Sequence, residues 1–196
     1  MENKEVLTGT NLINSYLPDL ELEIYHQEKI KKIKLSDYRG KWLILFFYPA
    51  DFTFVCPTEL KEMAENYDNL KKLGAEVISV STDNVYSHKA WHDTSETIKH
   101  IAFPMASDQT ARLSQSLGVY IEEKGEALRG TFIINPQGVI KVIEVNDNSI
   151  GRSAQELVRK LQAAIFVSKH GDQVCPASWQ PGGSTLKPDL DLVGKI

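Results

Sequence analysis

Cys56 is the residue of this sequence whose position best suits chemistry. It follows a very apolar run and stands where a helical pattern begins. In the first turn of a helix, the backbone dipole and unpaired N–H groups favour thiolate over thiol, and the thiolate is the reactive form of cysteine. Thr53 lies three residues before Cys56, and Pro49 lies seven before it. This spacing predicts a nucleophilic cysteine with a hydroxyl and a proline ring beside it.

The composition is that of a soluble globular protein of one domain. The chain has 196 residues and a formal net charge of −4, so nothing indicates binding to nucleic acid or to an anionic membrane. The longest apolar run, residues 42–50, is far shorter than the roughly 20 residues that span a bilayer. Residues 1–5 are polar and lack the apolar core of a secretion signal. We therefore expect a cytoplasmic protein.

Cys56 and Cys175 are the only two cysteines. Two are too few for a disulfide scaffold, and the absence of a Cys-x-x-Cys pair excludes a zinc ribbon and a thioredoxin-type dithiol. A lone cysteine is often an inert small hydrophobe, so the flanking residues must decide its role. His88 and His92, four residues apart, have no third ligand nearby. They indicate a surface helix rather than a metal site.

Strand and helix patterns alternate along the chain after a first part, residues 1–40, that predicts a hairpin and loops. A helix begins near Cys56 and ends at Gly74. Ser153 is the expected N-cap of the last helix, with Glu156 in the capping-box position. The sequence further predicts strands at 42–48, 77–81, 101–105, 131–134 and 139–145, helices at 84–98 and 111–117, and a buried stripe of Leu157, Leu161, Ala164 and Ile165 in the last helix.

This order of elements indicates a three-layer α/β domain with a mixed central sheet. Residues 42–48 are continuously apolar, as expected of a central strand that is covered on both faces. From Gly171 onward, glycine and proline become frequent and the periodicity is lost. We expect one domain over residues 1–170 and a C-terminal tail, residues 171–196, that carries Cys175.

These residues resemble a known family, the typical two-cysteine peroxiredoxins, and within it the bacterial alkyl hydroperoxide reductase peroxidase subunits. The family's Pro-x-x-x-Thr-x-x-Cys pattern is present in full, and the ending, residues 191–196, resembles the bacterial branch. The resemblance implies a thioredoxin-like fold. The matching residues are Pro49, Thr53, Cys56, Glu59, Arg129 ahead of its strand, Arg152 as a second arginine, and Cys175 in the resolving-cysteine segment 174–177.

The resemblance implies a thiol-dependent peroxidase that serves antioxidant defence. Cys56 attacks one oxygen of hydrogen peroxide or of an organic hydroperoxide, water or an alcohol leaves, and the cysteine becomes a sulfenic acid. In the family, the second thiol comes from the other subunit of a dimer, so Cys175 would form an intersubunit disulfide with Cys56.

Donors to the peroxide oxygens must supply most of the rate. A free thiol is about 3% ionised at pH 7, so complete ionisation gains at most about 30-fold. Arg129 and Thr53 are the expected donors, because negative charge moves from sulfur to the leaving oxygen. Pro49 is expected to keep water from the sulfur, and Glu59 to orient the pair of Arg129 and Arg152.

The resemblance also implies that no cofactor or metal is bound and that electrons come from a dithiol reductase. An NADH-dependent flavoprotein is the expected reductase, and thioredoxin is the alternative. The expected assembly is a homodimer that forms a decamer.

Two other functions compete with peroxide reduction. A holdase chaperone or redox relay is known in family members that overoxidise easily. Those carry a Gly-Gly-Leu-Gly stretch and a Tyr-Phe pair near the end, and both are missing here, at residues 97–103 and 192–196. We therefore expect resistance to sulfinic-acid formation. A general disulfide oxidoreductase would need two nearby thiols, and no Cys-x-x-Cys pair is present.

The aromatic residues near Cys56 leave alternatives open. Trp91 lies either near the partner's tail or in the core. Phe47, Phe52 and Phe54 are more often packing residues than substrate contacts, although apolar walls would suit organic peroxides.

Overall fold

The computed structural model describes residues 11–196 of the chain. A seven-stranded sheet forms its centre, made of β1 (Glu21–His26), β2 (Lys29–Lys34), β3 (Trp42–Phe47), β4 (Ala75–Ser81), β5 (Met105–Ser107), β8 (Arg129–Ile134) and β9 (Ile140–Asn146). The strand order is β2-β1-β5-β4-β3-β8-β9. Strands β3, β4 and β5 run parallel, and the other neighbours run antiparallel. The predicted mixed sheet is confirmed.

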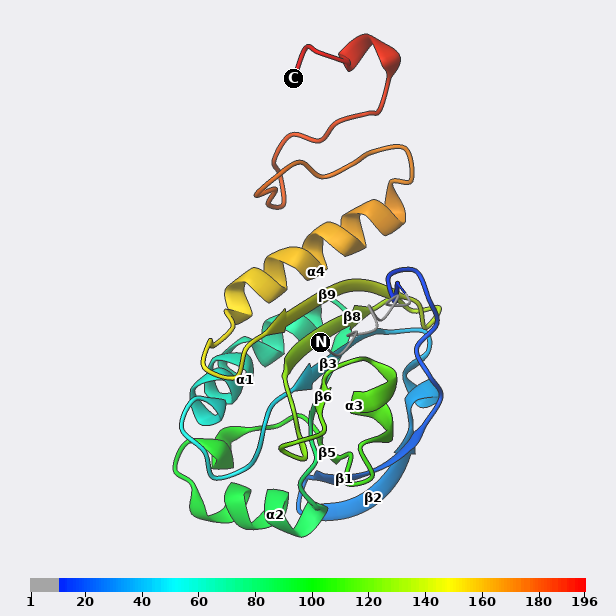
Figure 1. Ribbon diagram of the computed structural model, residues 1–196. Coiled ribbons are helices and arrows are strands. Elements are labelled where there is room, and N and C mark those ends of the chain that lie inside the picture. Colours follow the sequence, from blue (N-terminus) through cyan, green and yellow to red (C-terminus); the bar gives the residue numbers. More distant parts are fainter. Residues whose placement is uncertain (1–10) are drawn as a thin grey trace, which may run out of the picture.

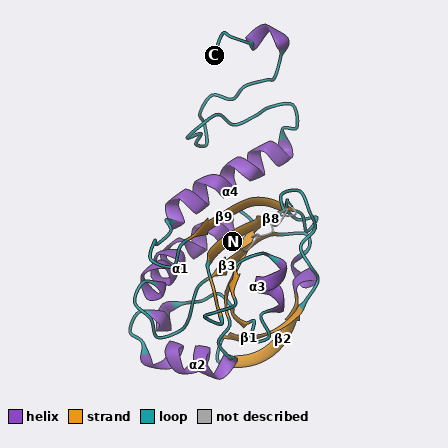
Figure 2. Cartoon of the chain, in the orientation of Figure 1, coloured by secondary structure: helices purple, strands orange, loops and turns teal. Residues whose placement is uncertain are grey.

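Helices lie on both faces of this sheet (Figures 1 and 2). The α-helices of the described residues are α1 (Cys56–Lys72), α2 (Val85–Thr94), α3 (Arg112–Ser116) and α4 (Ala154–Lys169). Short 3-10 helices are η1 (Leu35–Tyr38), η2 (Ile98–His100) and η3 (Leu190–Leu192). The predicted three-layer α/β arrangement is therefore confirmed.

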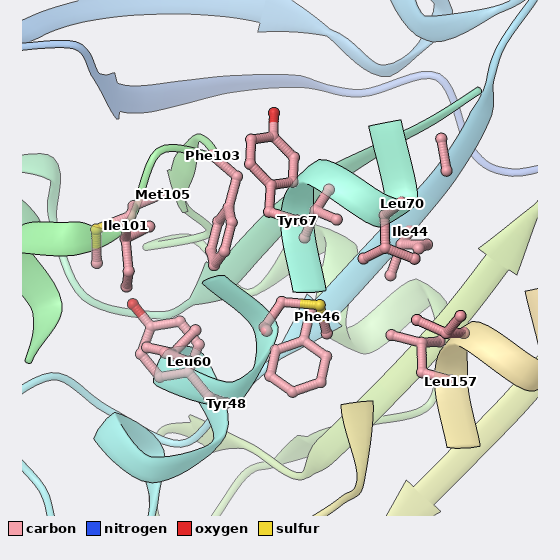
Figure 3. Close-up of a cluster of buried hydrophobic side chains, with 14 of the residues drawn as sticks. Ile44, Phe46, Tyr48, Leu60, Tyr67, Leu70, Ile101, Phe103, Met105 and Leu157 are labelled. Carbon is pink, nitrogen blue, oxygen red and sulfur yellow. The ribbon is translucent and has the colours of Figure 1, made fainter. Parts of the chain in front are cut away.

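Strand β3 is buried along its whole length, as its continuous apolar run predicts. Ile44 and Phe46 belong to the core under α1 and α4, and Leu45 and Phe47 belong to a second core on the opposite face. Because side chains alternate along a strand, one strand supplies both cores. Figure 3 shows the first core, in which the side chains of β3 lie among Leu60, Tyr67, Leu70 and Leu157.

Helix α1 is the element that carries Cys56, and its sequence specifies it well. Leu60, Met63 and Leu70 recur at helical spacing and are fully buried. The helix ends before Gly74, whose φ of 79° is a left-handed conformation that favours glycine. The predicted boundaries of this helix are confirmed.

Two predicted elements are shifted in the structure. The helix expected at 84–98 ends at Thr94, because Ser95 has extended backbone angles. The strand expected at 101–105 is instead β5, which begins at Met105 opposite Ser79 of β4. Ile101 and Phe103 are buried, but they fill the core from an unpaired segment. These residues are apolar because they are buried, and their apolar pattern is the same as that of a strand.

The last helix is capped less completely than its sequence predicts. Ser153 accepts a hydrogen bond from the Glu156 N–H, as an N-cap should. The Glu156 carboxylate, however, binds Arg159 one turn later. The capping box is therefore half formed. A small hairpin of β6 (Tyr120–Ile121) and β7 (Glu126–Ala127) was not predicted, because its strands have only two residues each.

The tail beyond α4 extends away from the sheet (Figure 1). Its first part is attached to α4 by Trp179, which is buried, packs on Phe166 with ring centroids 4.9 Å apart and accepts a hydrogen bond from Arg159 at its backbone oxygen. An isolated bridge joins Val174 to Leu186. Cys175 thus lies in a segment that is anchored to α4.

No helix within residues 11–196 is long and apolar enough to cross a bilayer. The polar segment at residues 1–5, from which we argued against a secretion signal, lies outside the described residues.

Candidate active site

Cys56 is the first residue of α1, and the loop of residues 48–55 connects it to the end of β3. Pro57 follows in the first turn, where its missing N–H costs the helix no hydrogen bond. The Cys56 side chain is fully buried, and the thiol is free. The sulfur therefore lies at the positive end of the helix and away from bulk water, as the position in the sequence predicts.

Arg129 reaches the same point from the neighbouring strand. Thr131 of β8 pairs with Phe46 of β3, so Arg129, two residues earlier in β8, lies where β3 ends. Its Nη1 lies 3.4 Å from the Cys56 sulfur and 2.6 Å from Glu59 Oε2. The antiparallel pairing of the two strands thus brings together residues that are 73 positions apart.

Glu59 binds both arginines from one turn further along α1. Arg152 donates to Glu59 Oε1 through its backbone N–H, at 2.8 Å, and through Nε, at 2.9 Å, and to Oε2 through Nη2, at 3.1 Å. Its Nη1 donates to the Gly130 carbonyl and the Thr131 hydroxyl. The guanidinium carbon of Arg152 lies 3.5 Å from the centroid of the Phe46 ring. Both guanidinium groups are therefore rigidly held.

This buried cluster contains two guanidinium groups and one carboxylate. Burial opposes the charge of Arg129, but its hydrogen bond to Cys56 and the charge of Glu59 outweigh burial and raise the Arg129 pKa. Burial likewise opposes the charge of Glu59, but the hydrogen bonds and charge of Arg152 prevail and lower the Glu59 pKa. Burial lowers the pKa of Arg152 itself. The cluster has one positive charge in excess, which a negatively charged sulfur would balance.

Thr53 and Pro49 lie in the loop between β3 and α1. The Thr53 hydroxyl donates its proton to the Ala50 carbonyl at 2.8 Å, so in this conformation its oxygen can only accept further hydrogen bonds. Thr53 is half-buried and Pro49 is buried. Both residues belong to the loop of residues 48–55, which connects β3 to the first turn of α1.

Cys175 lies against α4, with its sulfur 4.0 Å from the Ala163 carbonyl, and its thiol is also free. Burial raises the pKa of the Cys175 thiol, and the nearby Arg159 only partly offsets that effect. Cys56 and Cys175 of one chain thus lie in different environments: Cys56 is buried at the start of α1, and Cys175 is partly exposed on the tail.

A model of the AhpC/TSA family matches residues 13–143. The chain belongs to the AhpC/TSA family. Alkyl hydroperoxide reductase C of Pseudomonas aeruginosa is 47% identical over 186 residues, which cover 95% of this chain and all of that protein. The protein of the same name from Bacillus subtilis is also 47% identical over 186 residues, with the same coverage.

Solved structures agree with this assignment. The crystal structure of AhpC from Enterococcus faecalis is 52% identical, has a TM-score of 0.83 and covers 85% of this chain and all of that one. The reduced 2-Cys peroxiredoxin of Plasmodium vivax is 30% identical, has a TM-score of 0.89 and covers 93% of this chain and 96% of that one. The resemblance to typical two-cysteine peroxiredoxins, the thioredoxin-like fold and the assignment as a peroxiredoxin enzyme are confirmed.

One buried network beside the site of this AhpC/TSA protein was missed. His88 is fully buried, and its Nδ1 lies 2.8 Å from Asp51 Oδ2, while the Tyr48 hydroxyl donates to Asp51 Oδ1 at 2.8 Å. The predicted surface helix is confirmed in α2, which exposes one face to solvent, but His88 lies on its buried face. Asp51 lies in the loop before Cys56 and His88 lies on α2, 37 residues later, and nothing in the sequence indicates that their side chains form a hydrogen bond.

The aromatic residues near Cys56 divide between core and surface. Phe47 is buried, which confirms it as a packing residue, and Trp91 is also buried in the core of the chain. Phe52, at 58% exposure, lies against Trp91, with ring centroids 5.9 Å apart. Phe54 is 92% exposed, so the prediction that it is a packing residue is wrong for this chain by itself.

Proposed function

We propose that this chain reduces hydrogen peroxide and organic hydroperoxides to water and alcohols, with Cys56 as the attacking residue. The contact of 3.4 Å between Arg129 Nη1 and the Cys56 sulfur is the observation that carries this proposal. The names of the curated relatives, alkyl hydroperoxide reductase C, support this substrate class.

In the proposed reaction, the Cys56 thiolate attacks one peroxide oxygen while the O–O bond breaks. The sulfur becomes a sulfenic acid, and the leaving oxygen takes a proton to give water or an alcohol. Negative charge moves from the sulfur to the leaving oxygen during this step. Arg129 contacts the sulfur, so a charged donor is already in place along the path of that charge.

The neighbouring residues have supporting roles in this proposal. Glu59 fixes the guanidinium of Arg129 through a hydrogen bond of 2.6 Å, and Arg152 fixes Glu59 in turn. Thr53 contacts the peroxide once substrate is bound, and the ring of Pro49 keeps water from the sulfur.

Substituting Arg129 tests the proposal directly. Arg129→Met should lower the rate of Cys56 oxidation by hydrogen peroxide by about 10²–10³-fold, as for other removed donors in preorganised sites. Arg129→Lys keeps the charge but not the fork of donors, so we expect an intermediate loss. Single-turnover stopped-flow experiments measure both rates. Wild-type rates in Arg129→Met would refute the role of this contact.

The second half of the cycle is proposed to join two chains. Cys175 of the other subunit of a homodimer condenses with the Cys56 sulfenic acid, releases water and forms an intersubunit disulfide. Because Cys56 is fully buried, the first turn of α1 must open for this step. A dithiol reductase then restores both thiols, so the chain itself needs no bound cofactor. We propose an NADH-dependent flavoprotein as the reductase, with thioredoxin as the alternative, and dimers that assemble into a decamer.

The disulfide-forming step should accelerate with pH. Burial raises the Cys175 pKa, so only a small fraction of this thiol is ionised near neutral pH. The thiolate is the attacking form, and the rate should therefore rise by about tenfold per pH unit below that pKa. Non-reducing electrophoresis of samples quenched at intervals measures the rate of dimer formation. A rate that does not change with pH, or a dimer band in Cys175→Ser, would contradict this prediction.

A further inference from the structure

The backbone carbonyl of Asn148, in the loop between β9 and α4, determines how Arg129 is oriented. It accepts hydrogen bonds from Arg129 Nε, at 3.0 Å, and from Arg129 Nη2, at 2.8 Å. These two bonds occupy one edge of the guanidinium, so Nη1 is the nitrogen that meets Cys56 and Glu59. The position of a single carbonyl therefore decides which edge of Arg129 faces the sulfur.

The Asn148 side chain attaches this loop to the β6–β7 hairpin. Its Nδ2 donates to Glu126 Oε1, at 3.0 Å, and to the Ala127 carbonyl, at 3.3 Å. Both partners are acceptors, so the amide must present its NH₂ group to them. The β6–β7 hairpin, which was not predicted from the sequence, is thus hydrogen-bonded to the loop whose carbonyl binds Arg129.

The side chain is not needed to form the loop itself. The turn is closed by the Ile150 N–H, which donates to the Asp147 carbonyl at 2.9 Å, and by the Ser149 N–H, which donates to Asp147 Oδ1 at 2.8 Å. Asn148 Oδ1 is buried and has no hydrogen-bond partner within residues 11–196. A buried acceptor without a partner opposes folding. An asparagine at this position therefore lowers the stability of the fold, which suggests that its hydrogen bond to Glu126 has a role other than stabilisation.

We infer that Asn148, held by Glu126, is a positioning residue for Arg129 in peroxide reduction, an inference that rests on the proposed function. The Glu126 carboxylate fixes the Asn148 amide, the amide fixes the loop, and the Asn148 carbonyl fixes Arg129. Without the first contact, the carbonyl is free to move and Nη1 shifts relative to the sulfur. A misplacement of about 1 Å costs on the order of 100-fold in rate when the reacting geometry is preorganised.

The test is the single-turnover rate of Cys56 oxidation by hydrogen peroxide in the full-length protein. We expect Asn148→Ala and Glu126→Ala each to lower this rate by about tenfold, since the loop remains folded and moves by less than about 1 Å. The double variant should be no slower than either single variant, because both break the same contact. Glu126→Gln keeps an acceptor oxygen and should stay within about twofold of wild type.

Lys124→Ala is the matched control. It removes an ion pair of 3.6 Å between an exposed lysine and the partly buried Glu126, leaves the Asn148–Glu126 hydrogen bond in place, and should leave the oxidation rate unchanged. Alkylation of Cys56 by iodoacetamide, at a pH that ionises the thiol, needs no donor to a leaving oxygen. We therefore expect equal alkylation rates in Asn148→Ala and wild type.

Three results would overturn the positioning role: wild-type oxidation rates in both single variants, losses that multiply in the double variant, or alkylation that slows in parallel with oxidation. The last would mean a general loosening of the site. Cys56→Ser separates this inference from the proposed function. If Cys56→Ser still consumes peroxide at the wild-type rate, the proposed function fails. If Cys56→Ser is inactive while Asn148→Ala and Glu126→Ala both oxidise at the wild-type rate, the positioning role alone fails.

Discussion

Replacing Cys56 by serine is expected to abolish peroxide consumption, with a loss of more than about 10⁴-fold. A serine hydroxyl is hardly ionised at neutral pH, and an alkoxide oxygen cannot take the place of sulfur in a sulfenic acid. The buried contacts of Arg129 with Glu59 do not involve the thiol, so the fold should remain intact. Peroxide consumption with a thiol reductant present measures the loss.

Cys175→Ser is the matched control for that variant, because it removes the other thiol of the chain. It should oxidise once at the wild-type rate and then stop, since no second thiol remains to form the disulfide. A Cys56→Ser protein that keeps full activity, or a Cys175→Ser protein that loses the first oxidation, would contradict the assignment of the two cysteines.

Replacing Glu59 by glutamine should have the largest effect on stability. Glu59 is buried and is the carboxylate partner of both Arg129 and Arg152. Its removal leaves two buried positive charges beside each other, and breaking a buried ion pair in this way costs about 3–5 kcal/mol. Denaturant unfolding at fixed protein concentration measures the loss. We also expect slower oxidation of Cys56, because Arg129 loses its orienting partner.

The stability difference should depend on pH. The Glu59 pKa is lowered in the folded chain, so its contribution is complete above the ordinary value of 4.5 and is lost as pH falls through the lowered pKa. The wild type and Glu59→Gln should therefore converge in acid. Glu65→Gln, which removes only an exposed pair with Lys61, is the control and should change stability by less than about 1 kcal/mol. An equal, small loss in both variants would contradict the role of Glu59.

The candidate site could be predicted from the sequence where its residues lie close together along the chain. Pro49, Thr53 and Cys56 fall within one loop and one helical turn, so spacing alone indicated their chemistry. Arg129 carries no local signal, and it was found through the family resemblance. Its contact with Cys56 depends on the pairing of β8 with β3, which a single sequence does not specify.

The parts that could not be predicted depend on long-range contacts. His88 reads as a polar residue of a surface helix until Asp51 and Tyr48 are placed beside it. In the sequence, Asn148 looks like an ordinary turn residue. Its contact with Arg129 is made by the backbone carbonyl, which every residue type has, so the residue type gives no signal of that contact. Residues 101–105 have the apolar pattern of a strand, but core packing without pairing produces the same pattern.

The most direct test is to identify where one equivalent of hydrogen peroxide reacts with the Cys175→Ser protein. Intact mass and peptide mapping, with a dione reagent that traps sulfenic acids, locate the oxidised residue. We expect one dione adduct per chain, on Cys56, and none on Cys56 of Arg129→Met in the same time. Peroxide consumed at one of the three methionines, with Cys56 unmodified, would contradict the central claim that Arg129 prepares this sulfur for peroxide.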